Sequence, residues 1–228
     1  MTDRDKSKWS KKRTPRPPPR PLDTERLQEL ALAYVARFAT TAAKLETYLS
    51  RKLRERGWNA GKDRGEDRGE DRGEDIVEQS GTQDSWPDLQ AISARFVEMG
   101  YIDDEAYARS RRGGLLRRGY GPRRVSQDLY AAGIDEQIRS NLAPGEAAIR
   151  KAALALARKR RFGPFASEEP DRDRKQKQIA AMLRAGHGFD TVKAIMNAGS
   201  AGAAEQWAAE ACADDEFDVD GTSQNEDF

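Results

Sequence analysis

Residues 121–134, GPRRVSQDLYAAGI, contain one helix together with its start and stop signals. Pro122 suits the first turn of a helix, where its missing N–H would have no partner. The apolar residues that follow are spaced by four and then three positions: Val125, Leu129 and Ala132. Such spacing places them on one face, and Gly133 ends the helix because glycine accepts the left-handed backbone found at helix C-termini. The stretch therefore predicts a short amphipathic helix with a buried apolar face.

The same order of signals returns along the chain: a leucine, a glycine three or four residues later, then an apolar residue that opens the next helix. It occurs as Leu53…Gly57-Trp58, Leu129…Gly133-Ile134 and Leu183…Gly186…Phe189. Helical periodicity surrounds each occurrence, and strand-like alternation is almost absent. A three-helix unit of about 45 residues buries little surface alone, so it gains stability by stacking on neighbours. We therefore predict an all-α protein of three tandem three-helix repeats that form an elongated, curved body.

Composition separates two tails and an insertion from these repeats. Residues 1–21 are basic and rich in proline, and residues 199–228 are acidic, so both tails are expected to be disordered. The segment 59–84 repeats Asp-Arg-Gly-Glu three times and is predicted to be a flexible insertion. The predicted repeats cover, in order, residues 22–100 with the insertion inside them, residues 101–143 and residues 144–198.

The overall composition limits where the protein works. Of all residues, 37% are hydrophobic and 35% are charged. No apolar run approaches the ~20 residues that a membrane-spanning helix needs, and the basic N-terminus lacks the apolar segment of a secretory signal. A single cysteine, Cys212, fits a reducing compartment. We therefore expect a cytoplasmic protein that has no membrane partner.

The inventory of reactive side chains argues against catalysis. The chain has one histidine, His187, and one cysteine, which leaves no zinc ligand set and no evident Cys–His pair. It lacks the GxxxxGK[ST] phosphate loop, and residues 119–122, GYGP, are interpreted as a turn that starts a helix. We therefore predict that the protein is not an enzyme and has no catalytic residue, no metal site and no cofactor.

Positive charge gathers in the middle of the chain, where residues 109–124 contain seven arginines and no acidic residue. Arg123, Gln127 and Tyr130 lie opposite the apolar stripe of their helix. Arginine beside an exposed aromatic ring suits contact with single-stranded nucleic acid, and it suits an acidic protein surface equally. An ordinary solvated face would have the same composition. The candidate macromolecule-binding residues are Arg117, Arg118, Arg123, Arg124, Gln127, Tyr130, Arg150 and Lys151.

Two further arginines depart from the helical pattern. If Ala108 and Leu115 mark the buried face of a helix over residues 104–118, Arg111 and Arg112 fall on that same face. Either their side chains extend to solvent along the protein surface, or the helix is bent and partly open.

Four motifs, taken together and in this order, are specific enough to indicate a protein family. They are Leu49…Leu53…Arg56-Gly57-Trp58, Gly100-Tyr101-Ile102-Asp103-Asp104-Glu105-Ala106-Tyr107-Ala108, Arg117-Arg118-Gly119-Tyr120-Gly121-Pro122-Arg123-Arg124-Val125 and Gly133-Ile134-Asp135. Over residues 25–198 the chain resembles the RecX regulatory proteins, which are bacterial modulators of the RecA recombinase. The resemblance implies three tandem three-helix repeats. It also implies binding along the groove of the RecA filament on single-stranded DNA, blocked extension or promoted disassembly, and restrained strand exchange, ATP turnover and SOS induction.

Two functions from different classes remain open at this point. The first is a regulator of homologous recombination and DNA repair that binds RecA, with DNA contact secondary. The second is a sequence-nonspecific DNA-binding protein that competes with RecA for DNA. A scaffold built on the repeats is a third possibility. We expect a monomer, because no large uncompensated apolar stripe is visible, and we expect the acidic segment after Lys193 to fold back on the arginine-rich stretch.

Overall fold

The computed structural model describes residues 20–59 and 86–220, with side chains described up to residue 211. The predicted basic tail up to residue 19, nearly all of the predicted insertion, and residues 221–228 lie outside the described residues. The elements of the described part are α1 (Thr24–Val35), α2 (Ala42–Arg56), α3 (Leu89–Glu98), α4 (Asp104–Arg117), α5 (Pro122–Ala131), α6 (Glu136–Asn141), α7 (Glu146–Arg160), the 3-10 turn η2 (Gly163–Phe165), α8 (Arg172–Arg184), α9 (Phe189–Asn197) and α10 (Ala201–Asp220).

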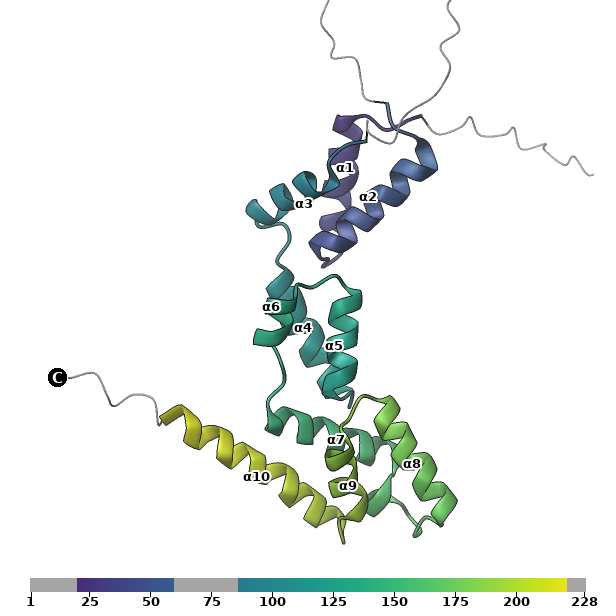
Figure 1. Ribbon diagram of the computed structural model, residues 1–228, viewed down its shortest axis with the longest axis vertical. Coiled ribbons are helices and arrows are strands. Elements are labelled where there is room, and N and C mark those ends of the chain that lie inside the picture. Colours follow the sequence, from purple (N-terminus) through teal and green to yellow (C-terminus); the bar gives the residue numbers. More distant parts are fainter. Residues whose placement is uncertain (1–19, 60–85, 221–228) are drawn as a thin grey trace, which may run out of the picture.

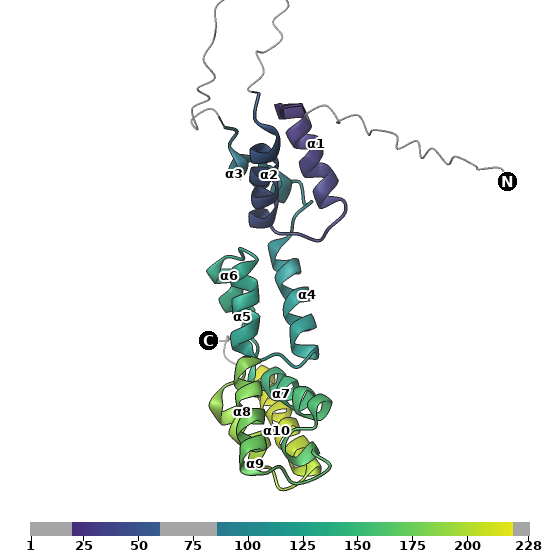
Figure 2. The same ribbon diagram turned by 90° about the vertical axis from the view of Figure 1, so that its right-hand side faces the viewer.

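The helices form an elongated stack of three groups (Figures 1 and 2). Helices α1–α3 lie at one end, α4–α6 in the middle and α7–α9 at the other end, where α10 packs along α7. Each group encloses its own hydrophobic cluster. The predicted all-α fold of three tandem three-helix repeats is therefore confirmed.

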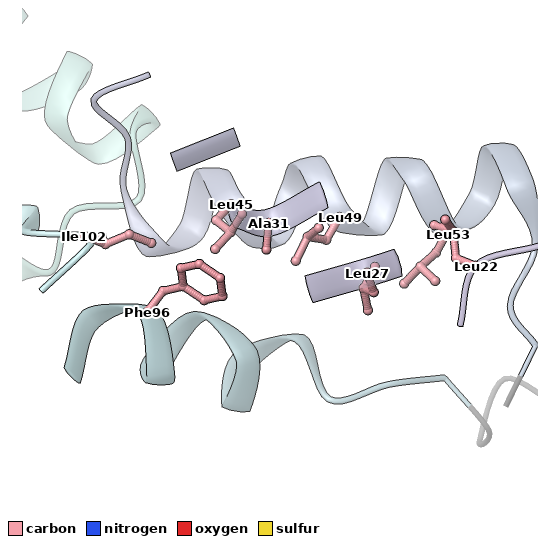
Figure 3. Packing of buried hydrophobic residues seen from close by; sticks show 8 residues of the cluster. All are labelled: Leu22, Leu27, Ala31, Leu45, Leu49, Leu53, Phe96 and Ile102. Carbon is pink, nitrogen blue, oxygen red and sulfur yellow. The ribbon is translucent and has the colours of Figure 1, made fainter. Parts of the chain in front are cut away.

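Leucines on α2 build the core of the first group. Leu45, Leu49 and Leu53 recur at every fourth residue and are fully buried. Figure 3 shows their side chains in one row, together with those of Leu27 from α1 and Phe96 from α3. Because burying a leucine side chain stabilises a fold by about 1.5–3 kcal/mol, this row holds α1 and α3 against α2.

The first group joins the second through the turn between α1 and α2. The Thr41 hydroxyl donates to the carbonyl of Ala132 at 2.6 Å, and the Ala42 N–H donates to the Asp104 carboxylate at 3.1 Å. Ala43 lies so close to Gly133 that a side-chain carbon added to Gly133 would be 2.2 Å from the methyl of Ala43. The turn between the first two helices of one repeat therefore rests on the C-terminal end of the second helix of the next.

The second and third groups join in the same way. The Gly121 N–H donates to the carbonyl of Ala185 at 2.9 Å, and the Arg123 N–H donates to the carbonyl of Gly186 at 3.2 Å. Gly186 has a φ of +95° and would place a side-chain carbon 2.5 Å from the backbone nitrogen of Arg124. Glycine is thus required there twice, by its backbone conformation and by the close approach of the neighbouring repeat.

His187 completes this second junction. The side chain is fully buried, and Nε2 lies 3.0 Å from the carbonyl oxygen of Gly119. A carbonyl only accepts hydrogen bonds, so Nε2 carries the proton. Burial lowers the pKa of His187, and the hydrogen bond to Gly119 opposes this shift in part. The only histidine of the chain is therefore part of the contact between two repeats.

The prediction of a disordered acidic tail over residues 199–228 is wrong for residues 201–220, which form α10. Ala204, Ala208 and Ala211 are buried and recur at i, i+4 and i+7, so they form a narrow face of small side chains. This face packs against α7. The acidic composition of the segment concealed this alanine stripe.

None of the helices in the described residues is both long and apolar enough to cross a membrane.

The close approach of the second and third groups can be tested with two glycine substitutions. A Cβ at Gly121 would lie 2.4 Å from the carbonyl carbon of Gly186, whereas a Cβ at Gly114, inside α4, meets no atom within 4 Å. We expect Gly121→Ala to lower the free energy of unfolding by about 1–3 kcal/mol. Gly114→Ala is expected to raise it by about 0.5–1 kcal/mol, because alanine is the better helix former. Urea unfolding followed by circular dichroism measures both, and equal effects would contradict the proposed role of Gly121.

His187 gives the stability of the protein a predictable dependence on pH. In the unfolded chain the imidazole gains a proton below its ordinary pKa of 6.5, whereas burial keeps it neutral in the folded protein. The unfolded state therefore binds more protons in this range, and its population increases as the pH falls. The contribution of neutral His187 is complete above pH 6.5 and is lost as the pH falls from there towards the lowered folded-state pKa.

We expect His187→Gln to reduce this acid sensitivity, because a glutamine amide can still donate to Gly119 but does not titrate. Urea unfolding of both proteins between pH 7.5 and pH 5 measures the effect. A wild-type protein that loses no more stability than the variant over this range would contradict the prediction.

Candidate macromolecule-binding face

Four of the predicted binding residues flank the turn between α4 and α5. Arg117 and Arg118 precede this turn, Arg123 and Arg124 follow it, and all four are exposed. Since the turn is hydrogen-bonded to residues 185 and 186, the backbones that carry these arginines are fixed by the contact between two repeats. We call these four residues the arginine face.

Most of the positive charge of the arginine face is not neutralised. Within the part of the chain that the structure describes, the side chains of Arg117, Arg123 and Arg124 make no ion pair and no hydrogen bond. The Arg118 guanidinium donates to the carbonyl of Gly114 at 3.1 Å and lies 5.8 Å from the ring centroid of Tyr120, a half-exposed side chain. Exposed guanidinium groups that are not held in an ion pair can contact phosphates or carboxylates of another molecule, and the nearby Tyr120 ring can stack on a base.

The outward side of α5 extends the arginine face. Gln127 and Tyr130 are exposed, and Tyr130 retains 71% of its accessible surface. The guanidinium of Arg139 from α6 lies 5.3 Å from the centroid of the Tyr130 ring and donates to the carbonyl of Ile134 at 3.1 Å. An aromatic ring that is held by a cation and open on its other side can stack on a base. Sequence analysis missed Arg139, because only the packing of α6 on α5 brings it to Tyr130.

An ion pair explains one of the two arginines that departed from the helical pattern. Arg111 donates to both carboxylate oxygens of Asp128 on α5, at 2.6 Å and 2.9 Å. These hydrogen bonds lower the pKa of Asp128. Arg111 therefore ties α4 to α5 and is neutralised within the protein. The Nε of Arg112 is buried and has no hydrogen-bond partner among the described residues.

Arg150 and Lys151, the two predicted binding residues on α7, are not part of the arginine face. Arg150 donates to Glu146 at 2.8 Å and to the carbonyl of Trp207 on α10 at 2.9 Å, and its guanidinium lies 4.8 Å from the Trp207 ring. Arg150 is thus engaged in holding α10. Lys151 is exposed and makes no ion pair within the described residues.

The α8 helix contributes a cation that sequence analysis did not include. Arg184 is exposed and directly precedes Ala185, whose carbonyl accepts the N–H of Gly121. Its backbone is therefore next to the turn that carries the arginine face. No sequence pattern could have placed it there, because residues 121 and 185 meet only through the junction of two repeats.

The chemistry of the described residues fits binding of anionic and aromatic groups. No group of three or more His, Cys, Asp or Glu side chains in residues 20–59 and 86–211 could hold a metal ion. The acidic segment after Lys193 was expected to fold back on the arginine-rich stretch. Within this segment α10 packs on α7 and η2, while the acidic side chains after residue 211 lie outside the described residues, so the contact stays a prediction.

Known proteins are similar to this chain in sequence and in fold. A family model described as "RecX, second three-helix domain" matches residues 103–141, which contain α4, α5 and α6. The regulatory protein RecX of Myxococcus xanthus is 30% identical over 188 residues, which cover 80% of this chain and 90% of that protein. The regulatory protein RecX of Mycobacterium sp. (strain JLS) is 30% identical over 183 residues, which cover 78% of this chain and 84% of that protein.

The crystal structure of RecX from Lactobacillus salivarius has the same fold. It superposes with a TM-score of 0.52 at 18% identity and covers 75% of this chain and 93% of that protein. The resemblance found in the sequence motifs is thus confirmed by relatives of nearly full length, and the chain belongs to the RecX family of regulatory proteins.

Proposed function

We propose that this protein binds the RecA recombinase and its filament on single-stranded DNA and restrains recombinase activity. The proposal rests on membership of the RecX family, whose relatives are named regulatory proteins. It places the protein in the cytoplasm, in homologous recombination, DNA repair and control of the SOS response. The protein acts as a monomeric binding protein without a cofactor.

The observation that carries the DNA-facing part of this proposal is the unneutralised charge of the arginine face. Arg117, Arg123 and Arg124 flank a turn that is hydrogen-bonded to the next repeat, and their exposed side chains make no close ion pair within the described residues. Phosphate contacts of such arginines release counterions, so they add affinity that depends on salt. Tyr130, held by Arg139, adds a ring on which an unstacked base can lie.

The elongated stack supports binding along a polymer. Three groups that each contact only their neighbours present a long surface, and the junctions fix the relative positions of binding side chains along it. An elongated regulator of this kind can contact filament protein at one place and the DNA backbone at another. In this proposal the contact with RecA is primary and the contact with DNA is secondary.

A second candidate function is sequence-nonspecific binding to DNA in competition with RecA. The arginine face would also serve this function, since contacts to phosphates carry no sequence information. The two functions differ in their dependence on salt and on stoichiometry. Binding through phosphates alone weakens steeply with ionic strength, whereas an apolar protein interface does not.

The contribution of the arginine face can be tested with Arg123→Ala combined with Arg124→Ala. We expect roughly a tenfold loss of affinity for single-stranded DNA and a decrease of about 1.4 in the salt slope, because two phosphate contacts are removed. Fluorescence anisotropy with a labelled oligonucleotide at several salt concentrations measures both.

The matched control is Arg172→Ala combined with Lys177→Ala, which removes the same charge from exposed positions near the start of α8. Its affinity should stay close to that of the wild type. If both double variants lose affinity equally, net charge alone explains the binding and the arginine face has no special role. Unchanged circular dichroism shows that each variant is folded.

The regulatory activity can be tested through the ATP hydrolysis rate of RecA from the same organism on single-stranded DNA. We expect inhibition at far less than one molecule of this protein per RecA, because a molecule bound to a filament affects many subunits. Inhibition should persist at moderate salt. Inhibition only when the DNA itself is saturated, and its loss at moderate salt, would support competition for DNA instead.

A further inference from the structure

The first repeat has a groove on its surface. Its lining residues belong to α1, to α3 and to the segment that follows α3, and none of them is part of the arginine face. Helices α1 and α3 each pack against α2, and the groove of about 590 Å³ lies between them. Figures 1 and 2 show α1 and α3 together in the end group of the stack. None of the residues that form the hydrogen bonds at the two junctions lines the groove.

Large apolar side chains line this groove without being buried. Leu32 from α1, Met99 after α3 and Tyr101 retain 48%, 47% and 55% of their accessible surface. Phe96 also lines the groove, and the same side chain belongs to the hydrophobic core of the first repeat. Apolar side chains that gather in one hollow indicate a site for another molecule more strongly than the same side chains scattered singly.

The lips of the groove carry charges that the protein itself does not neutralise. Glu25 and Glu29 stand on α1, and Arg95 stands on α3. None of the three makes an ion pair or a side-chain hydrogen bond within the described residues. Glu25 and Glu29 are four positions apart on one helix, so their like charges repel each other. A cation placed between them would remove this repulsion.

We propose that the groove binds an amphipathic helix of a partner protein. The apolar side of that helix enters between α1 and α3, and a lysine or arginine faces Glu25 and Glu29. The ten residues of α3 give the groove a wall of about 15 Å, which matches two to three turns of a bound helix. Recognition of an apolar helix face by such a groove, with charges at the lips to set its orientation, is a recurring mode of protein binding.

This inference rests on the proposed function, because it takes the bound helix to belong to the recombinase. It separates two tasks along the stack. The first repeat contacts protein through an apolar groove, while the arginine face between the second and third repeats contacts DNA phosphates. With one site for protein and another for DNA, the chain recognises a filament that contains both and binds it more tightly than DNA alone.

The test compares Met99→Glu with Val97→Glu in the full chain. Both residues are exposed to a similar extent, 47% and 43%, and lie two positions apart, but only Met99 lines the groove. Met99→Glu places a third acid in the groove, so we expect roughly a tenfold loss of affinity for purified RecA filaments on single-stranded DNA. Val97→Glu should bind within about twofold of the wild type. Cosedimentation at elevated salt, where phosphate contacts are weakened, measures filament binding.

Binding to free single-stranded DNA serves as the internal reference and should be the same for all three proteins. Equal filament binding by Met99→Glu and the wild type would overturn the groove proposal and leave the proposed function intact. A wild-type protein that neither binds nor inhibits RecA would overturn the proposed function and the groove proposal with it. Self-association of the wild type that Met99→Glu abolishes would assign the groove to a second copy and would also overturn the proposal. Urea unfolding shows whether each variant is folded.

Discussion

The stacking of the repeats depends on one recurring contact, in which the turn between the first two helices of one repeat lies against the C-terminal end of the second helix of the next. Thr41 meets Ala132 in the first junction, and Gly121 meets Ala185 in the second. Both contacts are hydrogen bonds between groups that are withdrawn from water, and such groups destabilise the fold when they lose their partners. Because the accepting carbonyl directly precedes a glycine in both cases, the chain can bring two backbones together at that position. The leucine–glycine pattern therefore marks the place where repeats join as well as the end of a helix.

These junctions decide which charges are available to other molecules. Lys44 of the first repeat donates to the Tyr107 hydroxyl of the second, and within the second repeat Arg111 is bound to Asp128, so both cations serve the fold. At the ends of the second junction, by contrast, Arg123 and Arg124 lie on the rim of the contact with their side chains exposed. The rigidity of the junction limits the conformational entropy that binding would otherwise remove. A protein that must recognise a regular polymer benefits from cations held at fixed separations.

The ends of the stack are closed in different ways. At the first end, Leu22 exchanges backbone hydrogen bonds with residues 57 and 59 beside Trp58, so the end of α2 is covered where no described repeat precedes it. At the other end, α10 covers α7 with a stripe of alanines, and its Glu205 pairs with Arg158. Terminal covering of this kind keeps a stack of repeats from adding further units through the surfaces that join them.

The sequence by itself determined the helical class, the number of repeats and the exposed position of Arg123, Gln127 and Tyr130, because these follow from local periodicity and from the few residues that start and stop helices. Family membership also followed from local motifs. Only the tertiary structure decided that Arg150 anchors α10, that His187 is buried against Gly119, and that the acidic segment contains a packed helix. The groove between α1 and α3 also became visible only there. In each of these cases the residues in contact are separated by tens of positions in the sequence. A contact between distant residues produces no local pattern of apolar and polar residues around either of them, so the sequence alone does not reveal it.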